Sequence, residues 1–229
     1  MPAEHDRLQY LDALGIDVWV PRGQAPQPAL VAEESTVGVD FLTPDWEELR
    51  ATVAACTLCQ LHQHRTQTVF GVGNRNADWM IIGEAPGAEE DRRGEPFVGR
   101  AGKLLDEMLR AVGLDRSTVF IANILKCRPP NNRDPAVDEA AACRAYLERQ
   151  IDMISPRLIL AVGRIAAQQL LHSNSAVGRM RGRVHSLSNR QVPVVVTYHP
   201  AYLLRSPSQK RKVWEDLCLA RQTAEESQT

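Results

Sequence analysis

Four short runs of almost uninterrupted apolar residues constrain the fold of this chain most strongly. They are WMIIG (79–83), VFIANIL (119–125), LILAVG (158–163) and VPVVVTY (192–198), and they are rich in β-branched residues. A strand that is apolar on both sides must be covered on both sides, which is typical of a parallel sheet between helices. The runs therefore predict a mainly parallel, four-stranded sheet.

Helical patterns fill the intervals between these runs. Asp134 and Pro135 are residue types typical of an N-cap and a first helical turn, and further helices are expected after Gly163 and around Trp214. Strands and helices then alternate along the chain, which predicts an α/β fold with three α/β/α layers. The clearest apolar helical face consists of Leu104, Leu105, Met108, Leu109 and Val112.

The amino-terminal part differs in charge from the rest of the 229-residue chain. Residues 1–48 contain two Arg and ten Asp or Glu, whereas the remainder contains 25 Lys or Arg and 18 Asp or Glu. Residues 21–43 contain three Pro and predict a linker between a peptide, residues 1–20, and a body, residues 44–229. The body is expected to begin with a helix capped by Thr43. A basic body behind an acidic head indicates that the body binds a polyanion.

The pattern of hydrophobicity and cysteine also predicts a cellular location. No run approaches the ~18 apolar residues of a membrane span, and the first residues lack the apolar block of a secretion signal. We therefore expect a cytoplasmic protein. In that reducing compartment, cysteines are more typical of metal sites or buried thiols than of disulfides.

Four of the five cysteines have the spacing of a metal centre. Cys56 and Cys59 form a C-x2-C pair, and Cys127 and Cys143 follow after 67 and 15 intervening residues. Two close thiolates can bind one side of a metal centre, and two later thiolates can complete it. Spacing alone leaves zinc, an iron–sulfur cluster and ordinary buried thiols as alternatives. Cys218, on the last amphipathic helix, is expected to lie in the core.

Unusual residues follow the predicted strands at their carboxyl ends, where open α/β sheets bind ligands. The segment GEAPG (83–87) follows the first strand, Asn123 lies near the end of the second, and HPAYLLR (199–205) follows the fourth. The glycine-rich turn allows backbone N–H groups to approach a ligand closely. It lacks the phosphate-loop and dinucleotide patterns, so a nucleoside triphosphate or NAD is not expected.

Three motifs and the four cysteines together closely resemble the family 4 uracil-DNA glycosylases, the iron–sulfur branch of that superfamily. The motifs are GEAPGAEEDRRGEPFVGRAGKLLD (83–106), FIANILKCRPPNNRDP (120–135) and VTYHPAYLLR (196–205). The resemblance covers residues 45–220 in the family order. It implies hydrolysis of the N-glycosidic bond of uracil in DNA, and a 4Fe–4S cluster on Cys56, Cys59, Cys127 and Cys143.

The residue types fit the recognition of an extruded base. A base must leave the duplex before its glycosidic bond can be cut. Phe97 offers an aromatic face for stacking, and the Asn123 amide matches O4 and N3–H of uracil but not cytosine. An ordinary core role for Phe97 and a backbone-bonding role for Asn123 are the alternatives.

Cleavage leaves negative charge on uracil and a cation-like sugar. The resemblance implies that His199 lies at uracil O2 and stabilises the anion by a hydrogen bond. Glu90 is our preferred carboxylate for positioning water or facing the sugar, with Glu84 and Asp91 as alternatives. In the best-known branch of the superfamily an Asp occupies the position of Ala85, so the identity of the base stays open.

The segment after His199 contains candidate DNA contacts. Tyr202, Leu203 and Leu204 can wedge into the base stack, and Arg205 can contact phosphate. The sequence shows no positioned lysine for a Schiff base, so we expect a monofunctional enzyme. A basic stretch for the DNA backbone, or alternatively a solvated loop, consists of Arg179, Arg181, Arg183 and Arg190.

Residues 7–22 stand apart from these motifs. Their sequence is similar to the amino-terminal peptide of the psi subunit of the bacterial replicative clamp loader, the DNA polymerase III psi subunit, which binds the chi subunit. The alternative function of the chain is thus a psi-type adaptor in DNA replication, with a glycosylase-like fold and little or no catalysis. The alternative for the segment itself is that it packs on its own body and binds no partner. The apolar face available for partner binding consists of Leu8, Leu11, Leu14, Ile16 and Trp19.

Overall fold

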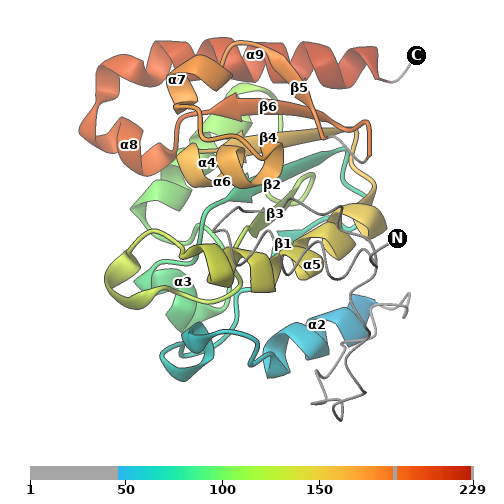
Figure 1. The fold of residues 1–229 in the computed structure, drawn as a ribbon. Helices are drawn as coiled ribbons and strands as arrows, with labels where there is room; N and C mark the ends of the chain where they lie inside the picture. The colour runs from blue at the N-terminus through green and yellow to red at the C-terminus, as the bar shows by residue number, and fades with distance from the viewer. Residues whose placement is uncertain (1–45, 188–189, 228–229) are drawn as a thin grey trace, which may run out of the picture. The chain divides into compact units, whose positions relative to one another are not determined.

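The structure is a computed structural model that describes residues 46–187 and 190–227 (Figure 1). The predicted peptide (1–20), the predicted linker (21–43) and the predicted helix cap at Thr43 lie outside the described residues. The predicted helix toward Cys56 is present from Trp46 onward.

The strands are β1 (Val72–Gly73), β2 (Trp79–Gly83), β3 (Phe120–Asn123), β4 (Leu158–Val162), β5 (Val184–Ser186) and β6 (Pro193–Thr197). The helices are α2 (Trp46–Ala55), α3 (Ala88–Arg93), α4 (Arg100–Ala111), α5 (Val137–Ile154), α6 (Arg164–Leu171), α7 (Val177–Met180), α8 (Pro200–Arg205) and α9 (Lys210–Glu226). Short 3-10 helices are η1 (Gln60–Gln63), η2 (Pro130–Asn132) and η3 (Pro207–Gln209).

The described strands form a six-stranded sheet in the order β1-β3-β2-β4-β6-β5. The four inner strands are parallel, as predicted, and they correspond to the four apolar runs. The predicted number of four strands is wrong, because β1 and β5 add an antiparallel strand at each edge. These edge strands are two and three residues long and partly exposed, so no apolar run marks them.

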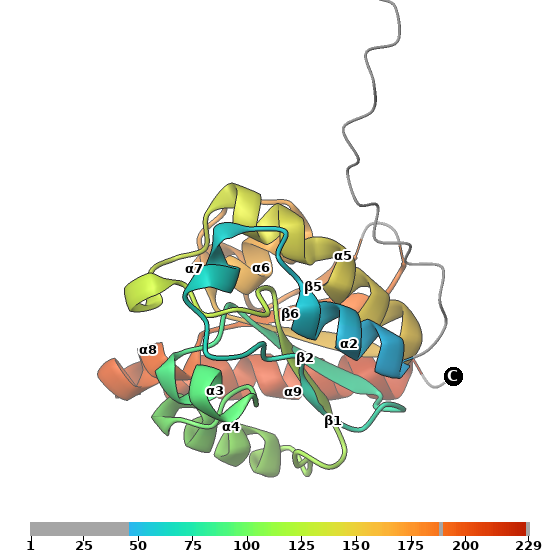
Figure 2. The same ribbon diagram turned by 90° about the horizontal axis from the view of Figure 1, so that it is seen from below.

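Side chains from the parallel strands alternate between two apolar cores, which confirms the three-layer α/β/α prediction. Met80 and Ile82 pack in one core with α2, α5 and α6, while Ile81 packs in the other with α4, α8 and α9. Figure 2 shows these two groups of helices on opposite sides of the sheet. The carboxyl ends of the strands are left uncovered by the layers, so their loops are available to form a site.

One predicted helix start is wrong. The N-cap of α5 is Ala136, not Asp134, and Glu139 from the first turn accepts a hydrogen bond of 2.8 Å from the Ala136 N–H. The Asp134 carboxylate instead forms an ion pair with Arg164 at the start of α6. Among the described residues, no helix combines the length and the apolar character that a membrane crossing requires.

Candidate active site

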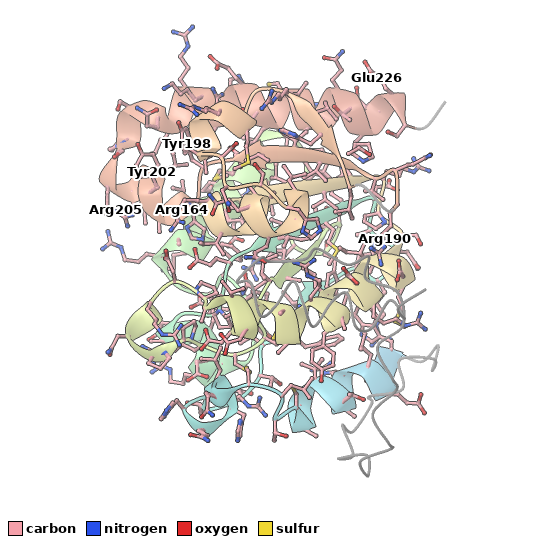
Figure 3. The ribbon with its side chains drawn as sticks, viewed as in Figure 1. Arg164, Arg190, Tyr198, Tyr202, Arg205 and Glu226 are labelled. Carbon is pink, nitrogen blue, oxygen red and sulfur yellow. The ribbon has the colours of Figure 1, made fainter. Side chains whose placement is uncertain are left out.

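The loops after β2, β3, β4 and β6 open into one pocket with a volume of about 710 Å³. Figure 3 shows four of its side chains, Arg164, Tyr198, Tyr202 and Arg205, gathered at one side of the described body. The pocket also brings together predicted site residues from all three motifs: Glu84, Ala85, Glu90, Phe97, Asn123 and His199.

Phe97 and Asn123 meet over Gly83 at the floor of the pocket. A Cβ atom on Gly83 would lie 2.5 Å from Asn123 Oδ1 and 2.6 Å from Phe97 Cζ, so only glycine allows both side chains to occupy this place. Asn123 is 2% exposed, and its Oδ1 has no hydrogen-bond partner among the described residues. A buried acceptor without a partner costs ~1–3 kcal/mol, so this oxygen is a candidate ligand-binding group.

Phe97 adopts a backbone conformation that a bulky residue rarely occupies, with φ of 55°. Its carbonyl and that of Pro96 both accept hydrogen bonds from Arg116 Nη2, and Arg116 Nε donates to Asp106 at 2.7 Å. Arg116 therefore holds the loop that carries Phe97. Arg116 was not predicted from the sequence, because it belongs to no motif and it holds the loop through backbone oxygens.

His199 lies beside Phe97, with ring centroids 5.6 Å apart. A Cβ on Gly163 would come within 3.0 Å of His199 Cβ, so the glycine after β4 makes room for the ring. His199 Nδ1 accepts a hydrogen bond of 3.1 Å from the Ala201 N–H, which leaves Nε2 as the protonated ring nitrogen. Burial, aided by the positive charge of Arg205, lowers the pKa of His199 to about 4. The imidazole is therefore a neutral hydrogen-bond donor at neutral pH.

The two glutamates that line the pocket have different surroundings. Glu90 accepts three backbone hydrogen bonds, from Gly87 at 3.1 Å, Val98 at 2.9 Å and Gly99 at 3.0 Å, and so braces the loop around Phe97. The Glu84 carboxylate accepts no hydrogen bond from the described residues, although the backbone carbonyl of Glu84 accepts one from the Leu125 N–H. Burial and, to a smaller extent, the charge of Asp134 raise the pKa of Glu84 to about 7.

The third candidate carboxylate, Asp91, lies elsewhere. It is 4% exposed and accepts hydrogen bonds of 2.9 and 3.1 Å from the Thr66 N–H. It is not among the residues that line the pocket. Asp91 therefore fastens the loop before β1 to α3 and cannot position water in the pocket.

The predicted DNA contacts after His199 separate into two groups. Tyr202 and Arg205 line the pocket, and Leu204 is 40% exposed. Leu203 is 1% exposed and packs in the core shared by α4 and α9. The prediction that Leu203 wedges into DNA is wrong, because α8 turns this side chain inward.

The arginines of the predicted basic stretch also separate into exposed residues and residues held in ion pairs. Arg183 is exposed, but Arg181 donates to Asp216 at 3.0 Å and is a structural residue, which corrects its predicted role at the DNA backbone. Arg190 pairs with Asp152 and lies on the side of the body opposite to Arg205 (Figure 3). Tertiary partners more than thirty residues away thus remove two of the arginines from the candidate DNA surface.

The four spaced cysteines line one cavity between α2, α5 and the loop after β3. Burial raises the pKa of Cys59, of Cys127 and of Cys143, the last to about 12, so free thiolates are unfavourable there. No group of three or more His, Cys, Asp or Glu side chains in residues 46–187 and 190–227 forms a site for a metal ion. Cys218 is exposed, so the expectation that it lies in the core is wrong.

This combination of fold and pocket agrees with a comparison to known families. A family model of the uracil DNA glycosylase superfamily matches residues 70–218, and the chain belongs to that superfamily.

Among individual relatives, type-4 uracil-DNA glycosylases are similar to most of this chain. The type-4 uracil-DNA glycosylase of Archaeoglobus fulgidus is 43% identical over 176 residues, which cover 74% of this chain and 88% of the relative. That of Thermotoga maritima is 44% identical over 169 residues, covering 72% and 87%. A type-5 uracil-DNA glycosylase of Thermus thermophilus is 30% identical over 159 residues, covering 56% and 72%. The resemblance predicted from the motifs is confirmed.

Proposed function

We propose that this chain removes uracil from DNA by hydrolysing the N-glycosidic bond. Family membership supports the reaction class, and the buried, unpartnered Oδ1 of Asn123 is the observation that carries the choice of base. This oxygen accepts the N3–H of uracil, while the amide nitrogen donates to O4. Cytosine presents the opposite pattern at both positions and would leave the buried amide unsatisfied.

The side chains around Asn123 supply the remaining recognition. The ring of Phe97 provides a surface against which a flipped pyrimidine stacks. Arg116 holds the carbonyls on either side of the Pro96–Phe97 peptide and thereby fixes that surface.

The protonation states of His199 and Glu84 fit hydrolysis of the N-glycosidic bond. The electron pair of the C1′–N1 bond leaves with uracil, and neutral His199 stabilises the resulting anion by donating from Nε2 to O2. Water adds to C1′ and gives a proton to a carboxylate. We assign that carboxylate as Glu84, because its oxygens are free and its pKa of about 7 suits a general base. Glu90, which we preferred from sequence, braces the loop through three hydrogen bonds.

Residues in the pocket and on the surface outside it contact the DNA strand around the extruded base; Tyr202 and Arg205 line the pocket. We assign phosphate contacts to Arg205 and Arg183, both exposed, and base-stack contacts to Tyr202 and Leu204. None of these roles depends on a particular DNA sequence.

We further propose that Cys56, Cys59, Cys127 and Cys143 hold a 4Fe–4S cluster. All four line one cavity, and burial raises the pKa of three of them, so a positively charged metal group is needed to stabilise the thiolates. The resemblance of the three motifs to the iron–sulfur branch of the superfamily favours a cluster over a single zinc ion at these four thiolates. When bound, the cluster supplies a structural link between α2, α5 and the loop after Asn123.

The experiment that tests this function uses oligonucleotides that differ in one base. After incubation with the protein, alkali breaks the strand wherever a base has been removed. We expect breakage at uracil and none at cytosine. Intact uracil-containing DNA after incubation with folded, iron-loaded protein would contradict the proposal.

A second role concerns residues 7–22, which lie outside the described residues and before the matched segment 70–218. We propose from their sequence alone that they bind the chi subunit and so bring the enzyme to the replication machinery. The relatives reported above carry glycosylase names and give no support to an adaptor without catalysis. Binding of chi by the full chain but not by a chain starting at residue 40 is the expected result, and equal binding or no binding by both contradicts it.

A further inference from the structure

We propose that Lys126 is a positioning residue that holds the backbone of Asn123, and thereby its amide, in the orientation that reads uracil. The inference rests on the proposed function. It links the base-reading pocket to the cysteine cavity through one buried side chain.

Lys126 is 1% exposed, and both of its described hydrogen-bond acceptors are neutral. Its Nζ donates to the Asn123 carbonyl at 3.0 Å and to Gln150 Oε1 at 2.6 Å. Gln150 is 0% exposed and donates in turn to the Phe70 carbonyl at 2.9 Å. The amine is therefore fixed between the end of β3 and the last turns of α5.

The backbone of the same residue is fixed from the side of the cysteines. The Lys126 carbonyl accepts a hydrogen bond of 2.7 Å from the Val69 N–H. Lys126 also lines the cavity of the four cysteines and precedes Cys127, whose sulfur accepts a hydrogen bond of 3.1 Å from Arg65. A cluster in this cavity would hold the Lys126 backbone, and Lys126 Nζ holds the Asn123 carbonyl.

The rest of the loop is fastened on the pocket side. The N–H groups of Ile124 and Leu125 donate to the carbonyls of Gly83 and Glu84, each at 3.0 Å. The Ile124 N–H belongs to the same peptide as the Asn123 carbonyl, so Gly83 holds this peptide at one end and Lys126 Nζ holds it at the other. Loss of the bond from Lys126 leaves only one of these two constraints, and a displacement of ~1 Å in a reacting group can cost about 100-fold in rate.

An apolar side chain would fill this place at lower cost than a buried amine. A residue that breaks the local preference for an apolar core is expected to serve a site. The hydrogen bond from Nζ to the Asn123 carbonyl identifies that site as the Asn123 loop.

The test uses the iron-loaded protein and Lys126→Met, which keeps the length of the side chain and removes its donors. We expect the variant to retain its iron and to bind abasic-site DNA as tightly as the original protein, because no base is read there. We expect single-turnover excision of uracil to fall at least about 10-fold. Lys103→Met, the same change at an exposed position of α4, is the matched control and should leave excision unchanged.

A second variant keeps the test decisive if the single change prevents folding. Lys126→Met with Gln150→Leu replaces the buried polar pair by apolar groups, which can be nearly neutral for stability. Unchanged excision in either folded variant overturns the inference, as does parallel loss of iron and of all DNA binding, which would show a general structural role. Failure of both variants to fold also overturns it. If the original protein itself leaves uracil in place, the proposed function fails instead.

Discussion

Burial drives two pocket side chains toward their neutral forms. It raises the pKa of Glu84 to about 7 and lowers the pKa of His199 to about 4, because removal from water disfavours either charge. His199 is thus uncharged throughout the neutral range, so in the proposed reaction it acts on the uracil anion as a neutral hydrogen-bond donor. Glu84 changes protonation near neutral pH.

Glu84 is expected to set the pH dependence of excision. Its carboxylate must be ionised to accept a proton from water, so activity rises as pH increases through about 7. In Glu84→Gln we expect a loss of about 100-fold and no rise around that pH. Single-turnover rates from pH 5 to 9 measure this, with Glu89→Gln on the exposed face of α3 as the control. A full rise with pH in Glu84→Gln would exclude Glu84 as the base.

As pH rises, Glu84 should increase the rate of excision but decrease the free energy of unfolding. Because its pKa is higher in the folded chain, the folded state binds more protons between pH 4.5 and about 7. The contribution of Glu84 to the free energy of unfolding therefore falls as pH rises through this range. Glu84→Gln should be more stable at pH 8 by roughly 1 kcal/mol, since solvent screens a partly exposed group. A variant that is less stable at pH 8 would contradict this.

The residues of the pocket differ in how well sequence could predict them. Asn123 and His199 were predictable because each ends or follows an apolar run, and parallel strands bring such positions together. Arg116 and Lys126 were not, because both act on backbone carbonyls, which leave no pattern in the sequence. Leu203 was misassigned because its direction depends on how α8 packs against α4.

At the scale of elements, α9 fixes the segment after α7 through a buried carboxylate. Asp216 is 0% exposed, and it accepts hydrogen bonds from Thr197 at 2.9 Å, Arg181 at 3.0 Å and the Gly182 N–H at 3.1 Å. This arrangement joins β6, α9 and the loop that leads to β5. It leaves the neighbouring Arg183 exposed at the surface.

Arg181 and Arg183 are therefore expected to give different phenotypes. Arg181→Ala leaves a buried carboxylate without its cation and should lower the free energy of unfolding by about 3 kcal/mol. Arg183→Ala should leave stability unchanged and reduce the slope of log binding constant against log salt concentration by about 1. Denaturant unfolding and DNA binding at several salt concentrations measure both. Unchanged salt dependence in Arg183→Ala would remove this residue from the DNA surface.

The helices and strands also differ in how well the sequence could predict them. The four inner strands were predictable because their apolar runs are buried on both faces. β1 and β5 were not, because a two- or three-residue edge strand is defined by its neighbour and not by its own composition. The start of α5 was predicted two residues too early, because Asp134 does not cap this helix but pairs with Arg164 on another helix.

At the scale of the whole molecule, the cysteine cavity and the pocket share the loop after β3. Cys127→Ser should therefore lose iron and lower the melting temperature. Cys218→Ser, at the exposed cysteine outside the cavity, should keep about four iron atoms per chain and the original melting temperature. Iron analysis and thermal unfolding of anaerobically purified protein measure this. Equal iron content in the two variants would exclude Cys127 as a ligand.

The most direct test concerns the amide at the floor of the pocket. Single-turnover excision of uracil from an oligonucleotide should be roughly 100-fold slower in Asn123→Ala, because two buried hydrogen bonds to the base are lost. Asn76→Ala, at an exposed asparagine before β2, should excise uracil at the original rate. If Asn123→Ala, correctly folded and loaded with iron, also excises uracil at the original rate, then this pocket does not read the base.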